Sequence, residues 1–114
     1  MAQSRIEIFA EMVKQQPGDA MIWYGLASEY SKAERWGEAS DALQSVVRIN
    51  PDYTAAYQML GTALLNQGRK EEARRAWEQG IEVARRTGAW KAQQHMEGLL
   101  AGMSKAASSP EFCD

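Results

Sequence analysis

The sequence contains the same pattern of side chains twice, separated by a fixed period. The stretch WYGLASEY at residues 23–30 is matched by YQMLGTAL at residues 57–64, and Pro17 and Pro51 keep the same spacing. Large, small and aliphatic side chains recur at matching offsets in both stretches. A fixed period of this length indicates a repeat architecture, in which one supersecondary unit stacks on the next.

Each repeat contains two helical patterns separated by a turn. Trp23, Leu26, Ala27 and Tyr30 recur at i, i+3, i+4 and i+7, which places them on one face of a helix. A second stripe of the same spacing follows in the segment 39–47, after a break near KAERWGE. The next repeat breaks at NQGRK, where Gly68 suits a helix C-terminus. The pattern therefore predicts two helical hairpins.

The ends of the chain resemble partial repeats. We expect a half-repeat at residues 4–16, full repeats at 20–53 and 54–87, and a capping helix at 89–103 with a polar outer side. These form one helical domain, residues 1–103. The tail 104–114 is small, polar and aperiodic, which predicts disorder.

Small residues mark the expected close contacts between helices. Ala27 and Gly61 occupy matching positions and would lie where the two helices of each hairpin approach most closely. Gly80 costs about 1 kcal/mol relative to alanine inside a helix, so we expect a neighbouring helix to press against it. Asp19 and Asp52 precede first helices and are expected to cap them.

These positions resemble the tetratricopeptide repeat, whose pattern is W-x2-L-G-x2-Y…A-x3-F…P. Residues 23–30 with Ala39, Leu43 and Pro51 match it once, with Ala27 in the glycine position. Residues 57–64 with Ala73 and Trp77 match it again. The resemblance implies an all-α, right-handed superhelical stack of antiparallel helical hairpins, whose first helices line a concave groove for a peptide or a partner's helix.

The resemblance also implies which side chains face that groove, namely those on first helices that packing does not use. They are Met21, Tyr24, Ser28, Lys32, Ala55, Gln58, Thr62, Leu65, Asn66 and Gln94. Some family members clamp an acidic chaperone C-terminus with lysine, asparagine and arginine. Tyr24, Ser28 and Met59 stand where lysine, asparagine and asparagine are expected, so we reject that ligand for this chain.

Charge argues against nucleic acid or a membrane surface as partner. The formal net charge is −2, from 13 basic and 15 acidic residues, and neither sign dominates. Residues 1–57 hold 5 basic and 8 acidic residues, a net of −3, whereas residues 58–114 hold 8 and 7, a net of +1. Within the basic run 68–86, we expect Glu71 to pair with Arg75 and Glu82 with Arg86 at i, i+4. That run is therefore interpreted as a solvated face.

No set of residues points to catalysis, a metal or a cofactor. His95 is the single histidine, which does not make a zinc site, and Cys113 has no base nearby in sequence. One cysteine allows no internal disulfide, and the N-terminus lacks a secretory pattern. We therefore expect a non-enzymatic, cytoplasmic module for binding protein or peptide.

Two alternatives to peptide recognition stay open. In the first, the chain is a structural module whose helices continue weakly into a second copy, with Trp90 and Met103 at the interface. In the second, it is an accessory domain of a larger complex. Sedimentation at several concentrations separates self-association from the leading hypothesis.

Overall fold

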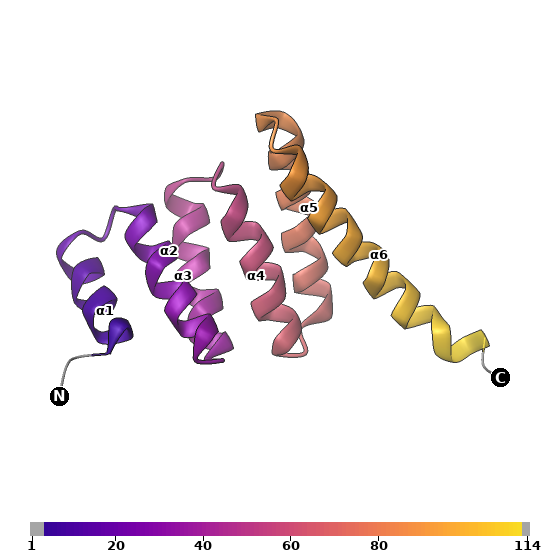
Figure 1. Ribbon diagram of the computed structural model, residues 1–114, viewed down its shortest axis with the longest axis horizontal. Coiled ribbons are helices and arrows are strands. Elements are labelled where there is room, and N and C mark those ends of the chain that lie inside the picture. The colour runs from indigo at the N-terminus through magenta and orange to yellow at the C-terminus, as the bar shows by residue number, and fades with distance from the viewer. Residues whose placement is uncertain (1–3, 113–114) are drawn as a thin grey trace.

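The computed structural model describes the backbone of residues 4–112 and the side chains of residues 4–103, and all regular secondary structure in that part is helical. The helices are α1 (Arg5–Gln15), α2 (Ala20–Lys32), α3 (Trp36–Ile49), α4 (Thr54–Asn66), α5 (Lys70–Thr87) and α6 (Trp90–Phe112). They follow one another along a stack with extents of 54 × 34 × 19 Å (Figure 1). The all-α repeat fold predicted from the sequence period is confirmed.

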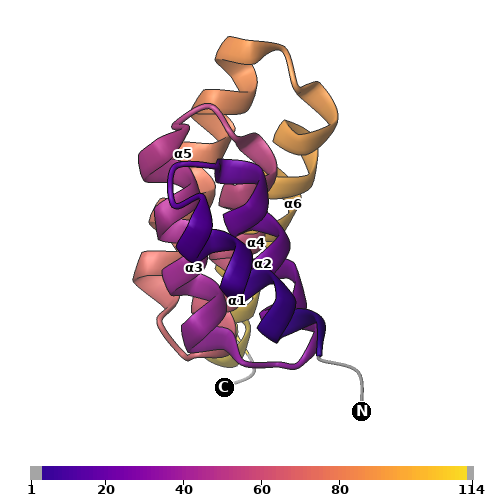
Figure 2. The same cartoon turned by 90° about the vertical axis from the view of Figure 1, so that its left-hand side faces the viewer.

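The helices lie in two layers. Viewed from the α1 end, α3 and α5 lie on one side of the stack, and α2, α4 and α6 on the other (Figure 2). The pairs α2–α3 and α4–α5 are the hairpins, and each packs on its neighbour in sequence. The first helices of successive units therefore share one layer. This arrangement is needed if they are to line a common groove.

The end of α6 differs from the sequence prediction. The helix runs to Phe112 rather than to 103, so the backbone of residues 104–112 is helical where a disordered tail was expected. Lysine and alanine, which occupy 105–107, are good helix formers. Cys113 and Asp114 lie outside the described residues.

Small residues lie at the helix contacts, as predicted. Ala27 is fully buried, and a Cβ added to Gly61 would overlap the indole of Trp77. Trp77 is 1% exposed, and its Nε1 donates a hydrogen bond to the carbonyl of Gln58 at 3.1 Å. In the second hairpin, the indole of Trp77 on α5 therefore packs directly against Gly61 on α4.

A close contact between helices also explains the glycine at position 80, in the interior of α5. A Cβ at this position would lie 2.6 Å from the Cβ of Tyr57 and would also meet the side chain of Met96. Met96 comes from α6 and is fully buried. The glycine therefore lets α6 and α4 approach α5 closely, which confirms the expectation of a neighbouring helix.

An aromatic side chain ties each first helix to the loop before it. The Nε1 of Trp23 donates to the carbonyl of Pro17 at 2.8 Å, and the hydroxyl of Tyr57 donates to the carbonyl of Pro51 at 2.8 Å. Donors and acceptors alike occupy equivalent positions in successive repeats, so the sequence repeat is also a hydrogen-bond repeat. The next pair of equivalent positions holds Arg85 and Lys91.

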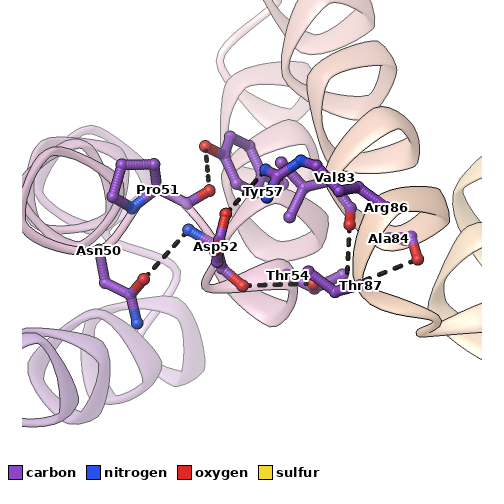
Figure 3. A network of polar contacts seen from close by, with 9 residues as sticks. All are labelled: Asn50, Pro51, Asp52, Thr54, Tyr57, Val83, Ala84, Arg86 and Thr87. Atoms are coloured by element: carbon purple, nitrogen blue, oxygen red, sulfur yellow. Dashed lines mark hydrogen bonds and ion pairs between the residues drawn. The ribbon is translucent and has the colours of Figure 1, made fainter.

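Asp52 joins the loop between α3 and α4 to the C-terminal end of α5. Asp19 caps α2 as predicted, accepting bonds from the backbone amides of Met21 and Ile22. The cap predicted for Asp52 is wrong, because the residue at the N-cap of α4 is Tyr53. Asp52 instead accepts a bond from Arg86 at 2.7 Å (Figure 3).

The partner of Arg86 also corrects the predicted pairs on α5. The ion pairs there are Glu71–Arg74 at 3.6 Å and Glu82–Arg85 at 3.0 Å, both spaced i, i+3. Arg86, at the end of α5, reaches the loop between α3 and α4. Its guanidinium holds the pKa of the Asp52 carboxyl below its ordinary value.

Asp52→Asn is expected to lower stability near neutral pH and to have no effect in acid. The folded-state pKa of Asp52 lies below the ordinary 3.8, so the carboxylate stabilises the fold above that pH. This contribution is lost as the pH falls from about 3.8 through the folded-state value. The measurement is urea unfolding of both proteins between pH 7 and pH 2. Since the pair is exposed, the difference at pH 7 should shrink in 1 M salt; a gap that persists in acid would contradict the ion pair as its cause.

A glutamine holds α4 against α3. The Nε2 of Gln67 lies within hydrogen-bond distance of the carbonyls of Trp36 and Ala63 and of the Oγ of Ser40. Ser40 is 2% exposed and donates onward to the carbonyl of Gly37. We call this set the Gln67 clamp.

The corresponding positions one repeat later cannot form such a clamp. Arg74 is the equivalent of Ser40 in the next repeat, and Ala101 is the equivalent of Gln67. The charge of Arg74 stays in solvent, and alanine offers no amide to bridge the two helices. Towards its C-terminal end α6 leans away from α5 (Figure 1).

Candidate functional site

The first helices form the walls of a hollow on one face of the stack. The hollow has a volume of about 340 Å³. It is lined by Tyr24, Ser31, Trp36, Ala55, Gln58, Met59, Thr62 and His95. Residues of α2, α4 and α6 supply all of this lining except Trp36, the first residue of α3. We call this hollow the concave groove.

Four of the residues predicted to face the groove line it. They are Tyr24, Ala55, Gln58 and Thr62. Three belong to α4, the middle helix of the layer, where the spacing i, i+3, i+7 keeps a single face toward the hollow. The structure therefore brings the predicted residues together mainly at the centre of the repeat array.

Two further predicted residues line other hollows. Lys32 borders a hollow between α1 and α2, where its Nζ pairs with Glu29 at 3.3 Å. Leu65 turns toward α5 and α6 and borders a third hollow there. Both residues lie in the last turn of a first helix, where the helix rotates their side chains away from the groove.

The remaining predicted residues lie outside the described hollows. Met21 is 73% exposed at the start of α2, and Ser28 is half-buried. Asn66 donates from its Nδ2 to the carbonyl of Thr62 at 2.8 Å. Gln94 is exposed on α6, and its neighbour His95 takes the groove position.

Four lining residues were not predicted. Ser31, Met59 and His95 lie on first helices, and Trp36 opens a second helix. A tryptophan one turn before Ala39 was an available signal for the last of these. No sequence signal pointed to His95, because its position in the groove depends on the tilt of α6.

The groove is uncharged at its walls. None of its lining residues is Lys, Arg, Asp or Glu. The ring of Tyr24 stacks on Tyr53 with centroids 5.1 Å apart. Burial, with a smaller effect from Tyr53, raises the pKa of the Tyr24 phenol, which therefore stays a neutral donor and acceptor.

One polar atom in the groove has no partner. The Oγ of Ser31 is shielded from solvent and makes no hydrogen bond among the described residues. A buried hydroxyl without a partner costs about 1–3 kcal/mol. The fold itself carries this cost, because an atom that solvent cannot reach is also closed to a ligand in the groove.

Over the part of the chain that the structure describes, no three His, Cys, Asp or Glu side chains come together as metal ligands. Among the described residues, no helix combines the length and apolar character needed to cross a bilayer. What the groove offers is neutral hydrogen-bonding groups between apolar side chains, the usual composition of a recognition surface.

A stack of helical hairpins with first helices lining one groove defines a helical repeat protein of the protein-interaction class. The chain belongs to the tetratricopeptide repeat family, whose model matches residues 6–60 and 30–101. It is 32% identical over 101 residues to a TPR repeat-containing protein of Pseudomonas aeruginosa, covering 89% of this chain and 96% of that one.

Solved structures share the fold. A protein from Bordetella parapertussis has a TM-score of 0.82 at 24% identity, covering 94% of this chain and 93% of that one. The first TPR of Spaghetti, bound to the HSP90 peptide SRMEEVD, has a TM-score of 0.67 at 23% identity, covering 84% of this chain and 77% of that one. At these identities the likeness establishes the fold alone.

Proposed function

We propose that the concave groove binds a short, uncharged segment of a partner protein, either an extended peptide or one face of a helix. The observation that carries this proposal is the lining: polar groups of Tyr24 and Gln58 lie among Trp36 and Met59, and no lysine, arginine, aspartate or glutamate is part of it. The binding is non-catalytic.

The chemistry of the lining selects the ligand. Amide and hydroxyl groups both donate and accept, which suits a peptide backbone. Trp36 and Met59 offer apolar and polarizable contact to side chains, and methionine adapts to varied shapes. An acidic segment would have to bury carboxylates against neutral groups, which is costly without a paired charge.

The neighbour bound to SRMEEVD therefore serves as a contrast. That peptide carries two glutamates and an aspartate, and in this chain Tyr24, Ser28 and Met59 stand where we expect a clamp for such a tail to have lysine and asparagine. We expect SRMEEVD to bind at least 10-fold more weakly than an uncharged peptide selected against this protein.

The test selects peptides by display and maps the tightest uncharged one by backbone chemical shifts. We expect the shifts to cluster on α2, α4 and His95. Tyr24→Ala and Gln58→Ala should each weaken binding by about 10-fold, the effect of losing one central contact of about 1.4 kcal/mol.

The matched control is Gln94→Ala, which alters an exposed residue of α6 outside the groove and should leave the affinity unchanged. Shifts confined to α3 and α5, or SRMEEVD binding as tightly as the selected peptide, would overturn the proposal.

A further inference from the structure

The lean of α6 opens the hollow that Leu65 borders, which we call the α5–α6 wedge. Its volume is about 460 Å³. It is lined by Leu65, Lys70, Glu71, Arg74, Trp77, Leu99, Gly102 and Met103. Aliphatic and aromatic side chains from three helices form its floor, and charged side chains of α5 form its rim. One repeat earlier, the equivalent position is closed because the Gln67 clamp holds α4 against α3.

At the opposite end of the stack, α1 presents an unused apolar face. Its inner side packs on α2, where Phe9 fills the space beside Gly25 and Val13 is buried. Its outer side carries Ile8, 43% exposed, and Met12, 37% exposed. These residues are spaced i, i+4 and therefore form one strip.

Carboxylates border this strip. Glu7 and Glu11, also spaced i, i+4, lie beside Ile8 and Met12 and are exposed. We call these four residues the α1 outer face. Glu11 has a weak internal partner, because its Oε1 lies 4.0 Å from Lys14 and both are exposed.

We propose that the α1 outer face of a second copy docks into the α5–α6 wedge. Ile8 and Met12 would cover the floor formed by Leu65, Leu99 and Met103. The carboxylates beside them would meet the rim cation Lys70, and would share Arg74 with Glu71, its partner on α5 at 3.6 Å.

The complementarity extends to the repeat pattern and to the charge of the two halves. In the repeat register α1 corresponds to a second helix and α6 to a first helix. Residues 1–57 carry a net charge of −3 and residues 58–114 a net of +1, from 5 basic and 8 acidic against 8 basic and 7 acidic residues.

The contact is heterologous. The two surfaces lie at opposite ends of the stack (Figure 1), so one molecule cannot join its own. A head-to-tail contact of this kind produces open chains unless the rotation closes a ring. Met103 belongs to the wedge, in agreement with the self-association alternative, whereas Trp90, although 60% exposed, is not part of its lining.

The test is sedimentation of the whole chain from micromolar to millimolar concentration. We expect the average mass to rise with concentration, beyond that of a dimer, and to fall when salt is added, because exposed charge pairs are screened. A strict monomer up to millimolar concentration overturns the proposal.

Two variants each remove one surface. Ile8→Lys with Met12→Lys places cations on the α1 outer face, opposite Lys70 and Arg74. Gly102→Arg fills the wedge, and the fold accepts it because a Cβ at Gly102 meets nothing within 4 Å. Each variant alone should be monomeric, and circular dichroism should show each one folded.

Mixing the two variants gives the sharpest result. Each retains the surface that the other has lost, so an equimolar mixture should form a 1:1 dimer and no larger species. A mixture that stays monomeric, or variants that still assemble alone, would refute the head-to-tail contact. Met21→Lys, which alters an exposed methionine outside both surfaces, should assemble like the original protein. Peptide binding in the concave groove should survive in both monomeric variants.

Discussion

Trp77→Ala should lower the free energy of unfolding by about 3–5 kcal/mol, the cost of emptying a large core position. The indole is 1% exposed and is the ring against which Gly61 allows α4 to pack. Its Nε1 also donates to the carbonyl of Gln58, so the substitution removes both a filled volume and a hydrogen bond. Since small domains are stable by about 5–15 kcal/mol, this loss is a large fraction of the stability of the chain.

Urea unfolding followed by circular dichroism measures the effect. Trp90→Ala is the matched control, because it removes the same side chain from a site that is 60% exposed. It should change stability by no more than about 0.5 kcal/mol. Equal losses for the two variants would contradict the assignment of Trp77 to the core of the second hairpin.

Gly80→Ala and Gly98→Ala should change stability in opposite directions, although both exchange a helical glycine for a better helix former. At Gly80 the new methyl group would meet the Cβ of Tyr57 at 2.6 Å together with Met96, and overpacking of this kind costs about 1–3 kcal/mol. At Gly98 a Cβ meets nothing within 4 Å, so the gain in helix propensity, up to about 1 kcal/mol, is retained.

Thermal unfolding of the three proteins under one set of conditions decides this prediction. The pair controls for propensity, because only the surroundings of the two glycines differ. Stabilisation by Gly80→Ala would mean that α6 does not press on α5 at Met96. Destabilisation by Gly98→Ala would mean that the outer side of α6 is covered within the monomer.

The sequence period predicted the hairpins well because each repeat solves the same packing problem. Ala27 and Gly61 lie at close helix contacts since a larger side chain would separate the two helices. These are local consequences of helix periodicity, and they do not depend on the rest of the chain. The same logic placed Gln58 and Thr62 in the groove, on a helix flanked by its neighbours on both sides.

The errors arose where a side chain depends on a partner far away in sequence. Asp52 has the residue type of a cap, but it lies one residue before the N-cap Tyr53, and its carboxylate pairs with Arg86 instead. His95 lines the groove, and Gln94 does not, because the tilt of α6 sets which residue faces inward. At the positions that hold the Gln67 clamp one repeat earlier, α5 and α6 carry Arg74 and Ala101. A pattern averaged over repeats does not contain such differences.

The Gln67 clamp also makes the two walls of the concave groove unequal in their support. Helix α4 is fastened at both ends, by the hydrogen bond from Tyr57 to Pro51 and by the Gln67 clamp, whereas α6 packs on α5 at Met96 and diverges from it towards its C-terminal end (Figure 1). A short ligand seated between Tyr24 and Gln58 meets fixed surroundings, and a longer one must also settle the angle of α6. Affinity for the proposed ligand would then depend on ligand length, because only a longer ligand would contact the part of α6 whose angle is not fixed by packing on α5.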